Sequence, residues 1–136
     1  MDRLFLDTNV LLDVLEKRPM FVVDSLRVIG LAKSGKVRAA VSPLSLSDIT
    51  YILRKTEQDM VLRFFVKLRE AVEIAAIGEQ EVDAALLAAG MPDFEDGLQW
   101  QAARTWKATH FITRNTCDFP GNQGIVIVTP TDFLGV

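Results

Sequence analysis

Four aspartates occupy positions in the sequence where a carboxylate could do chemistry as well as interact with solvent. Asp7 directly follows the apolar residues 4–6, and a lone charge at the end of a buried strand is costly unless a partner or a cation neutralises it. Asp48 lies inside a predicted helix, Asp96 lies at the start of a later helix, and Asp118 follows a predicted strand. Oxygen ligands suit Mg²⁺ or Mn²⁺, so the four acids predict a metal site if the fold brings them together.

Each of these acids also has a simpler explanation when it is considered alone. Asp48 could be an exposed helix residue, and Asp96 could complement the positive end of a helix dipole. Asp118 could simply cap a turn. Asp7 is the hardest to explain in this way, because the strand before it is wholly apolar. The hypothesis of a site therefore depends on the four acids as a set.

Short apolar runs alternate with segments of helical periodicity, and the acids lie where these elements meet. The expected strands cover residues 3–7, 37–42, 72–77, 110–115 and 124–130. The expected helices cover residues 9–17, 20–35, 42–55, 58–71, 79–90 and 95–108, with a short last turn at 129–135. Strands separated by helices pair in parallel, so the sequence predicts an α/β fold, a three-layer α/β/α sandwich with a mostly parallel central sheet. One edge of such a sheet would collect the acids.

Length and composition favour a single domain over residues 1–136 and exclude some classes of function. Of the 136 residues 49% are hydrophobic, and no linker marks a domain boundary. The net charge of −3 argues against binding of nucleic acid through bulk basicity, although a metal can supply positive charge locally. The N-terminus lacks the features of a signal peptide and no apolar run approaches a membrane span, so we expect a cytoplasmic protein without membrane contact.

Catalysis by histidine or cysteine is not expected. Cys117 is the single cysteine, which excludes a disulfide framework and a cysteine-based zinc cluster. His110 is the single histidine, and its place at the start of an apolar strand favours a structural role. A nucleophile–histidine system would depend entirely on that one residue.

Four blocks of sequence stand in order along nearly the whole chain: LFLDTNVLLD at residues 4–13, SPLSLSDITYILRK at 42–55, DFEDGLQWQAA at 93–103 and FITRNTCDF at 111–119. Together they resemble the PIN-domain proteins, the family that contains the VapC toxins. The resemblance implies an α/β/α sandwich that acts as a Mg²⁺- or Mn²⁺-dependent ribonuclease. For the toxin branch it also implies a type II toxin–antitoxin pair, in which a small antitoxin inhibits the enzyme.

The resemblance also assigns roles to individual residues. It implies three catalytic acids that bind the metal: Asp7, Asp96 and Asp118. It implies three polar residues that orient these acids or a water molecule: Asn9, Thr113 and Asn115. The fourth catalytic acid of the family is usually a glutamate, and the candidate here is Asp48, whose shorter side chain leaves direct contact with the metal open. Gly97 stands where the family often has alanine, which loosens its helix by up to ~1 kcal/mol.

Arg114 is the predicted RNA-binding residue, because it adjoins the last acidic block. Other basic residues are weaker candidates, since any one of them could be an ordinary solvated side chain: Arg54, Lys55, Arg63, Lys67, Arg104 and Lys107. The resemblance implies an RNA substrate, a possible antitoxin and a homodimer, and the high apolar content agrees with a protein partner.

Two other classes of protein remain as alternatives. The chain could keep the PIN fold as a catalytically weak or inactive module that binds RNA or protein, which Asp48 in place of glutamate would favour. It could also be a phosphotransfer protein, either a receiver domain or an aspartyl phosphatase. A phosphatase needs a second aspartate two residues after the first, where Asn9 stands, and a receiver needs paired acids after its first strand. The RNA target and the number of metal ions stay open.

Overall fold

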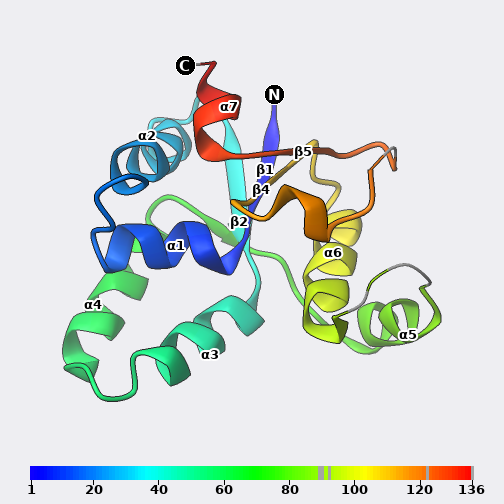
Figure 1. The fold of residues 1–136 in the computed structure, drawn as a ribbon, viewed down its shortest axis with the longest axis horizontal. Helices are drawn as coiled ribbons and strands as arrows, with labels where there is room; N and C mark the ends of the chain where they lie inside the picture. Colours follow the sequence, from blue (N-terminus) through cyan, green and yellow to red (C-terminus); the bar gives the residue numbers. More distant parts are fainter. Residues whose placement is uncertain (89–90, 92, 122, 136) are drawn as a thin grey trace.

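The computed structural model describes residues 1–88, 91, 93–121 and 123–135, and its centre is a five-stranded sheet (Figure 1). The strands are β1 (Arg3–Leu6), β2 (Arg38–Val41), β3 (Glu73–Ile74), β4 (His110–Ile112) and β5 (Val126–Val128). Their order is β3-β2-β1-β4-β5, and every neighbouring pair is parallel. The strand order changes direction between β1 and β4. Open parallel sheets bind ligands beyond the carboxyl ends of their strands at such a point.

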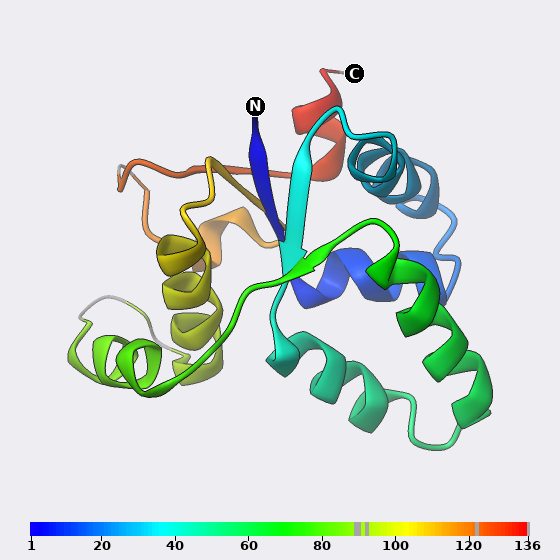
Figure 2. The same cartoon turned by 180° about the vertical axis from the view of Figure 1, so that it is seen from behind.

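Helices cover both faces of this sheet, so the predicted three-layer α/β/α arrangement is confirmed (Figures 1 and 2). One side carries α1 (Thr8–Leu15), α2 (Val22–Lys33), α4 (Gln58–Arg69) and the short α7 (Pro130–Leu134), with α3 (Pro43–Ile52) against α1 and α4. The other side carries α6 (Phe94–Trp106), with α5 (Glu79–Leu87) packed on it. Within the described residues, no helix has the length and apolar character needed to span a membrane.

The central strand β1 supplies side chains to both layers of the core. Leu4 and Leu6 are fully buried in the cluster formed with α1, α2 and α4, whereas Phe5 points to the opposite side. There the ring of Phe5 stacks on Phe111 of β4 with the ring centroids 5.2 Å apart, and Trp100 of α6 lies 5.5 Å from Phe111. β1 is buried on both faces, as parallel strands usually are, and Asp7 leaves the sheet directly from this core.

Helix caps fix where the site-forming helices begin. Asp7 caps α1 by accepting a hydrogen bond from the backbone N–H of Thr8 at 2.9 Å. Ser42 caps α3, with Pro43 at the first helical position, as the sequence predicted. Asp93 caps α6 and accepts from the backbone N–H groups of Glu95 and Asp96 at 2.8 and 3.2 Å. Two of the predicted acids therefore lie at the start of a helix: Asp7 is the cap of α1, and Asp96 is in the first turn of α6.

Some elements differ from their predicted bounds. The strand expected at 72–77 is reduced to Glu73–Ile74, because β3 is an edge strand that pairs only with β2 before the chain leaves for α5. The strand expected at 110–115 ends at Ile112, and a short 3₁₀ helix, Thr116–Asp118, follows it. The helix expected at 79–90 ends at Leu87 in the structure, and its predicted last residues, 89 and 90, lie outside the described residues.

The order of the strands also separates the fold from the receiver alternative. Receiver domains have the flavodoxin-like order 2-1-3-4-5, in which the third strand lies next to the first. Here the third strand is at the edge and β4 lies beside β1. A receiver domain is therefore excluded by the topology.

Candidate metal centre

Asp7 is held in a fixed position at the point where the strand order changes. Its side chain is 7% exposed. One carboxylate oxygen, Oδ1, accepts the N–H of Thr8 at 2.9 Å. The other, Oδ2, accepts from the hydroxyl of Thr113 at 2.8 Å and from Nδ2 of Asn9 at 3.3 Å. The backbone N–H of Asp7 donates to the carbonyl of Ile112, which extends the pairing of β1 with β4.

Asp7 forms part of the floor of a cavity of about 390 Å³ at the carboxyl edge of the sheet. The cavity is lined from α1, α3, α6 and the loop after β4 by acids and amides: Asp7, Asn9, Asp48, Glu95, Asp96, Gln99 and Asn115. Its remaining wall is formed by Thr8 and by three larger side chains: Leu12, Tyr51 and Ile52. No lysine, arginine or histidine belongs to this lining in the part of the chain that the structure describes. Among the described residues, the lining of the cavity thus gathers negative charge without a basic partner.

The pKa values of three of these acids are raised by their surroundings. Burial raises the pKa of Asp7, and the nearby charges of Asp118 and Asp48 raise it further against the effect of its hydrogen bonds. Burial, followed by the charges of Asp7, Asp93 and Asp118, raises the pKa of Asp96 to about 6. Burial first, and the mutual repulsion of the acids second, therefore make the ionised forms of Asp7 and Asp96 less favourable than in water.

Glu95 is the third acid whose pKa is raised. Interaction with the carboxyl of Asp48, followed by burial and the charge of Asp48, raises the pKa of Glu95 to about 7. Asp93 and Asp96 add smaller repulsions. Negative charge therefore accumulates between the first turn of α6 and α3.

The chemistry of this donor set fits a hard divalent cation, because it consists of carboxylate, amide and hydroxyl oxygens without a competing basic group. A cation would offset the mutual repulsion of the acids, which adds to the effect of burial on their pKa values. As the side chains stand, no three of the acids among the described residues are placed to hold one ion together. Binding would therefore require some of these side chains to change conformation.

Three of the four predicted acids lie in the lining of the cavity, and the fourth lies outside it. Asp7, Asp48 and Asp96 all line the cavity. Asp118 lies in the 3₁₀ helix and is exposed outside the lining, although it is close enough to raise the pKa values of Asp7 and Asp96. Asp118 is thus at the rim of the site. Its role as a metal ligand stays a prediction, as do the catalytic roles of Asp7, Asp48 and Asp96.

The polar residues predicted to orient the acids form one connected turn. Asn9 donates to Asp7 and to the hydroxyl of Thr113, and its own Oδ1 accepts the backbone N–H of Arg114 at 3.2 Å. Thr113 is fully buried, and its hydroxyl also accepts the N–H of Asn115 at 3.0 Å. Asn9 and Thr113 therefore contact Asp7 directly, whereas Asn115 supports Thr113 through its backbone and lines the cavity.

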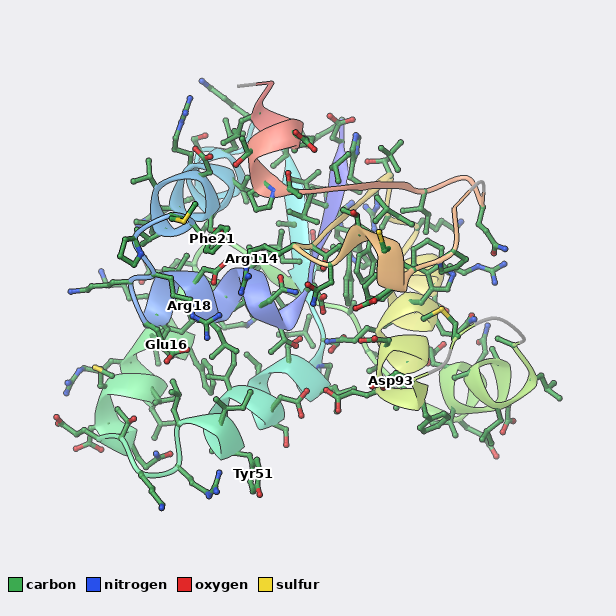
Figure 3. All side chains as sticks on the ribbon, viewed as in Figure 1. Glu16, Arg18, Phe21, Tyr51, Asp93 and Arg114 are labelled. Carbon is green, nitrogen blue, oxygen red and sulfur yellow. The ribbon has the colours of Figure 1, made fainter. Side chains whose placement is uncertain are left out.

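Arg114 does not point into this cavity. Its Nε lies 2.7 Å from Oδ2 of Asp13, and its guanidinium carbon lies 4.4 Å from the ring centre of Phe21. Figure 3 shows Arg114 beside Phe21 and Arg18 along α1. RNA binding by Arg114 stays a prediction, but much of its side chain is engaged by α1 and by the residue before α2.

Sequence reasoning missed Glu95, Gln99 and Asp13. Glu95 could have been suspected because it adjoins Asp96 in the first turn of the same helix. Gln99 lies three residues after Asp96, so helical spacing places it on the same side. Nothing in the sequence marked Asp13, which looks like an ordinary polar residue of an amphipathic helix but is fully buried.

Gln99 joins the three helices that surround the cavity. Its Nε2 donates to the hydroxyl of Thr8 at 3.1 Å and to that of Ser45 at 2.7 Å, and its Oε1 accepts from Ser42. The hydroxyls of Thr8 and Ser45 lie 2.7 Å apart. This buried network ties the first turns of α1 and α3 to α6, so it sets the spacing of the helices that carry the acids.

Comparison with known proteins assigns the family. The sequence model of the PIN domain matches residues 3–117, so this chain belongs to the PIN-domain family. A toxin–antitoxin complex from Klebsiella pneumoniae is similar in structure, with a TM-score of 0.68 and 22% identity over 93% of this chain and 96% of that one. No curated protein sequence matches the chain significantly.

Two further solved structures share the fold. VapBC2 from Rickettsia felis, bound to a DNA fragment from its promoter, has a TM-score of 0.61 and 19% identity over 92% of this chain and 96% of that one. VapC20 from Mycobacterium tuberculosis, a toxin that cleaves the sarcin–ricin loop, has a TM-score of 0.61 and 14% identity over 88% of this chain and 91% of that one. The chain therefore has the fold of VapC toxins.

Proposed function

We propose that this PIN-domain protein is a Mg²⁺- or Mn²⁺-dependent endoribonuclease. The observation that carries the proposal is the cavity at the switch between β1 and β4, where Asp7, Asp48 and Asp96 meet without a basic partner in its described lining. Asp7, Asp96 and Asp118 would hold the ion, with Asp48 beside them. A bound divalent cation would offset the negative charge of a phosphodiester and lower the pKa of a water molecule.

The residues of the chain contribute position rather than proton transfer. Asp7 is kept in one orientation by hydrogen bonds from Thr8, Asn9 and Thr113, so it needs no rearrangement to present its carboxylate. The Gln99 network holds α3 and α6 at a fixed separation around the substrate space. Because the lining is acidic, binding of an RNA phosphate there would depend on a cation.

The likeness to toxin–antitoxin complexes supports a more specific proposal. We infer that the chain is the toxin of a type II toxin–antitoxin pair, that it works in the cytoplasm as a homodimer, and that a small antitoxin inhibits it. Light scattering of the purified protein would test the dimer. A small gene beside the coding sequence, with a product that binds this chain and blocks cleavage, would test the pair.

Cleavage of a synthetic RNA in the presence of Mn²⁺ tests the enzymatic proposal. EDTA should stop the reaction, and Asp7→Asn should remove most of it. Asp59→Asn changes an exposed acid at the start of α4 and should leave the rate unchanged. Cleavage that persists in Asp7→Asn would identify a contaminating nuclease and overturn the assignment.

A binding module without cleavage is the second candidate. It is favoured by the finding that no three of the described acids are placed to hold one ion as they stand. Such a module would bind RNA or a protein partner equally well in EDTA and in Mn²⁺, and it would leave RNA intact in both.

A further inference from the structure

The cavity at the carboxyl edge of the sheet has a second, uncharged wall. Leu12 of α1 and two neighbouring residues of α3, Tyr51 and Ile52, form this wall beside the acids. A cation held by the acids would bind a phosphate group, but it would leave the base of the same nucleotide without a partner. The uncharged wall is the part of the lining whose chemistry suits a base.

Helix α3 carries apolar side chains on two different sides. Ile49 is fully buried and Leu53 is 9% exposed, and these two residues join α3 to the core. Tyr51 and Ile52 are 67% and 49% exposed. They follow Asp48 by three and four residues, so helical spacing places them on the side of α3 that faces the cavity. The core of the fold therefore does not account for the Tyr51 and Ile52 side chains.

Arg54 holds the ring of Tyr51 from one face. Its guanidinium carbon lies 4.2 Å from the ring centre, and its Nη1 donates to the backbone carbonyl of Tyr51 at 2.9 Å. Among the described residues, Arg54 forms no ion pair and Tyr51 stacks on no other aromatic ring. Figure 3 shows Tyr51 projecting from the last turn of α3. The ring is thus oriented by Arg54 and still open to a flat partner.

An unpaired nucleobase is the flat group that fits this surface. Bases of any sequence stack on an exposed aromatic ring, and the positive charge of Arg54 would attract the adjoining phosphate. A base inside a duplex is already stacked between its neighbours and paired, so it cannot take this place. The acids and Arg54 also complement each other, because a nucleotide chain needs a cation at one phosphate and positive charge at the next.

We propose that Tyr51 stacks on an unpaired nucleobase of the RNA, while Arg54 supports the ring and faces the adjoining phosphate. This assignment rests on the proposed function, because it concerns the nucleotide whose phosphate the metal-binding acids would hold. It makes Tyr51 a substrate-binding residue that requires a single-stranded nucleotide but reads no sequence.

The fluorescence of 2-aminopurine, a base analogue whose emission falls when it stacks, measures this contact directly. The probe is a short RNA with one 2-aminopurine among abasic nucleotides, and phosphorothioate linkages keep it intact in Mn²⁺. Its emission should fall on binding to the wild type and to Tyr51→Phe, which keeps the ring. Tyr51→Leu keeps an apolar side chain without a ring, so it should leave the emission unchanged and bind the probe about fivefold or more weakly.

A fully abasic chain of the same length is the matched ligand. The wild type and both Tyr51 variants should bind it equally, because it offers no base. Arg54→Lys keeps the charge but not the planar group on the ring, so it should bind the abasic chain normally and reduce the change in emission. Arg54→Gln should weaken binding of both ligands. Lys36→Gln removes an exposed charge before β2, at the opposite edge of the sheet, and should change neither.

Equal weakening of both ligands by Tyr51→Leu would show that the ring only shapes the cavity, and this would overturn the assignment. Unchanged emission of the probe on the wild type would also overturn it, while cleavage of RNA that EDTA stops would leave the proposed function intact. A wild-type protein that neither binds nor cleaves RNA in Mn²⁺ would overturn the proposed function, and this assignment with it.

Discussion

The Nε atom of Arg114 lies 2.7 Å from Oδ2 of Asp13, a carboxylate that has no exposed surface. The other oxygen of Asp13 lies 3.2 Å from Arg18, so both of its oxygens are engaged. Arg114 also donates its backbone N–H to Asn9, which contacts Asp7. The ion pair therefore links the loop after β4 to α1, and through Asn9 it supports the position of Asp7.

Asp13→Asn should destabilise the protein by about 2–4 kcal/mol. Loss of one partner leaves the other charges of a buried pair uncompensated, and the value is moderated because Arg18 and Arg114 keep some contact with water. Urea unfolding followed by circular dichroism measures it. Glu57→Gln, which breaks an exposed pair with Arg63, should change the free energy of unfolding by less than about 0.5 kcal/mol. An equally small effect of Asp13→Asn would contradict the role of the ion pair.

Asp96→Asn should stabilise the metal-free protein at neutral pH. The pKa of Asp96 is raised to about 6 in the folded state from an ordinary 3.8, so the folded protein holds this proton more tightly than the unfolded chain. The resulting stability is fully present below pH 3.8 and is lost as the pH rises through 6. The gain at pH 7 should be on the order of 1 kcal/mol, because solvent screens a partly exposed group.

Thermal melts in EDTA across this range would measure the effect of Asp96→Asn. The difference from wild type should disappear at low pH, where Asp96 is protonated in both states. Added Mn²⁺ should reverse the order of the two proteins, because it would stabilise a wild type that binds it. A variant that melts below the wild type in EDTA at pH 7 would show that Asp96 is stabilised by a partner.

Gln99→Leu should destabilise the protein by about 1–3 kcal/mol, since it removes the shared partner of the buried hydroxyls of Ser42 and Ser45 and of the partly buried hydroxyl of Thr8. Urea unfolding is again the measurement. Gln80→Leu, at an exposed position of α5, serves as the control and should have little effect. No loss in Gln99→Leu would mean that water or local rotation satisfies the three hydroxyls.

Tyr51→Ala should weaken RNA binding under the proposed function. Tyr51 lines the cavity, yet it is 67% exposed, and the guanidinium carbon of Arg54 lies 4.2 Å from its ring centre. An exposed ring of this kind can stack on a nucleobase, which contributes about 1–3 kcal/mol per base. Filter binding of an uncleaved RNA analogue to Tyr51→Ala and Tyr51→Phe would test this, because the phenylalanine variant keeps the ring. Equal weakening of both would exclude stacking.

The sequence predicted the elements and the edge of the sheet where the acids meet, because both follow from apolar periodicity and from parallel pairing. Asp7, Asp48, Asp96 and Asp118 were therefore expected together; the first three line one cavity, whereas Asp118 lies outside its lining. The directions of the long side chains depend on packing between distant segments, which periodicity does not contain. For this reason neither the turn of Arg114 toward Asp13 nor the place of Glu95 in the lining of the cavity was anticipated.

The central place of β1 in the sheet has a consequence for how the protein is made. β1 is synthesised well before its neighbour β4, and the hydroxyl that orients Asp7 comes from Thr113, 106 residues further along the chain. Pairings of such high contact order form late in folding. A ribosome-bound chain that stops before β4 lacks Thr113, which donates to Asp7, and Asn115, which lines the cavity, so catalytic competence should arise only after β4 and the loop that follows it have been translated.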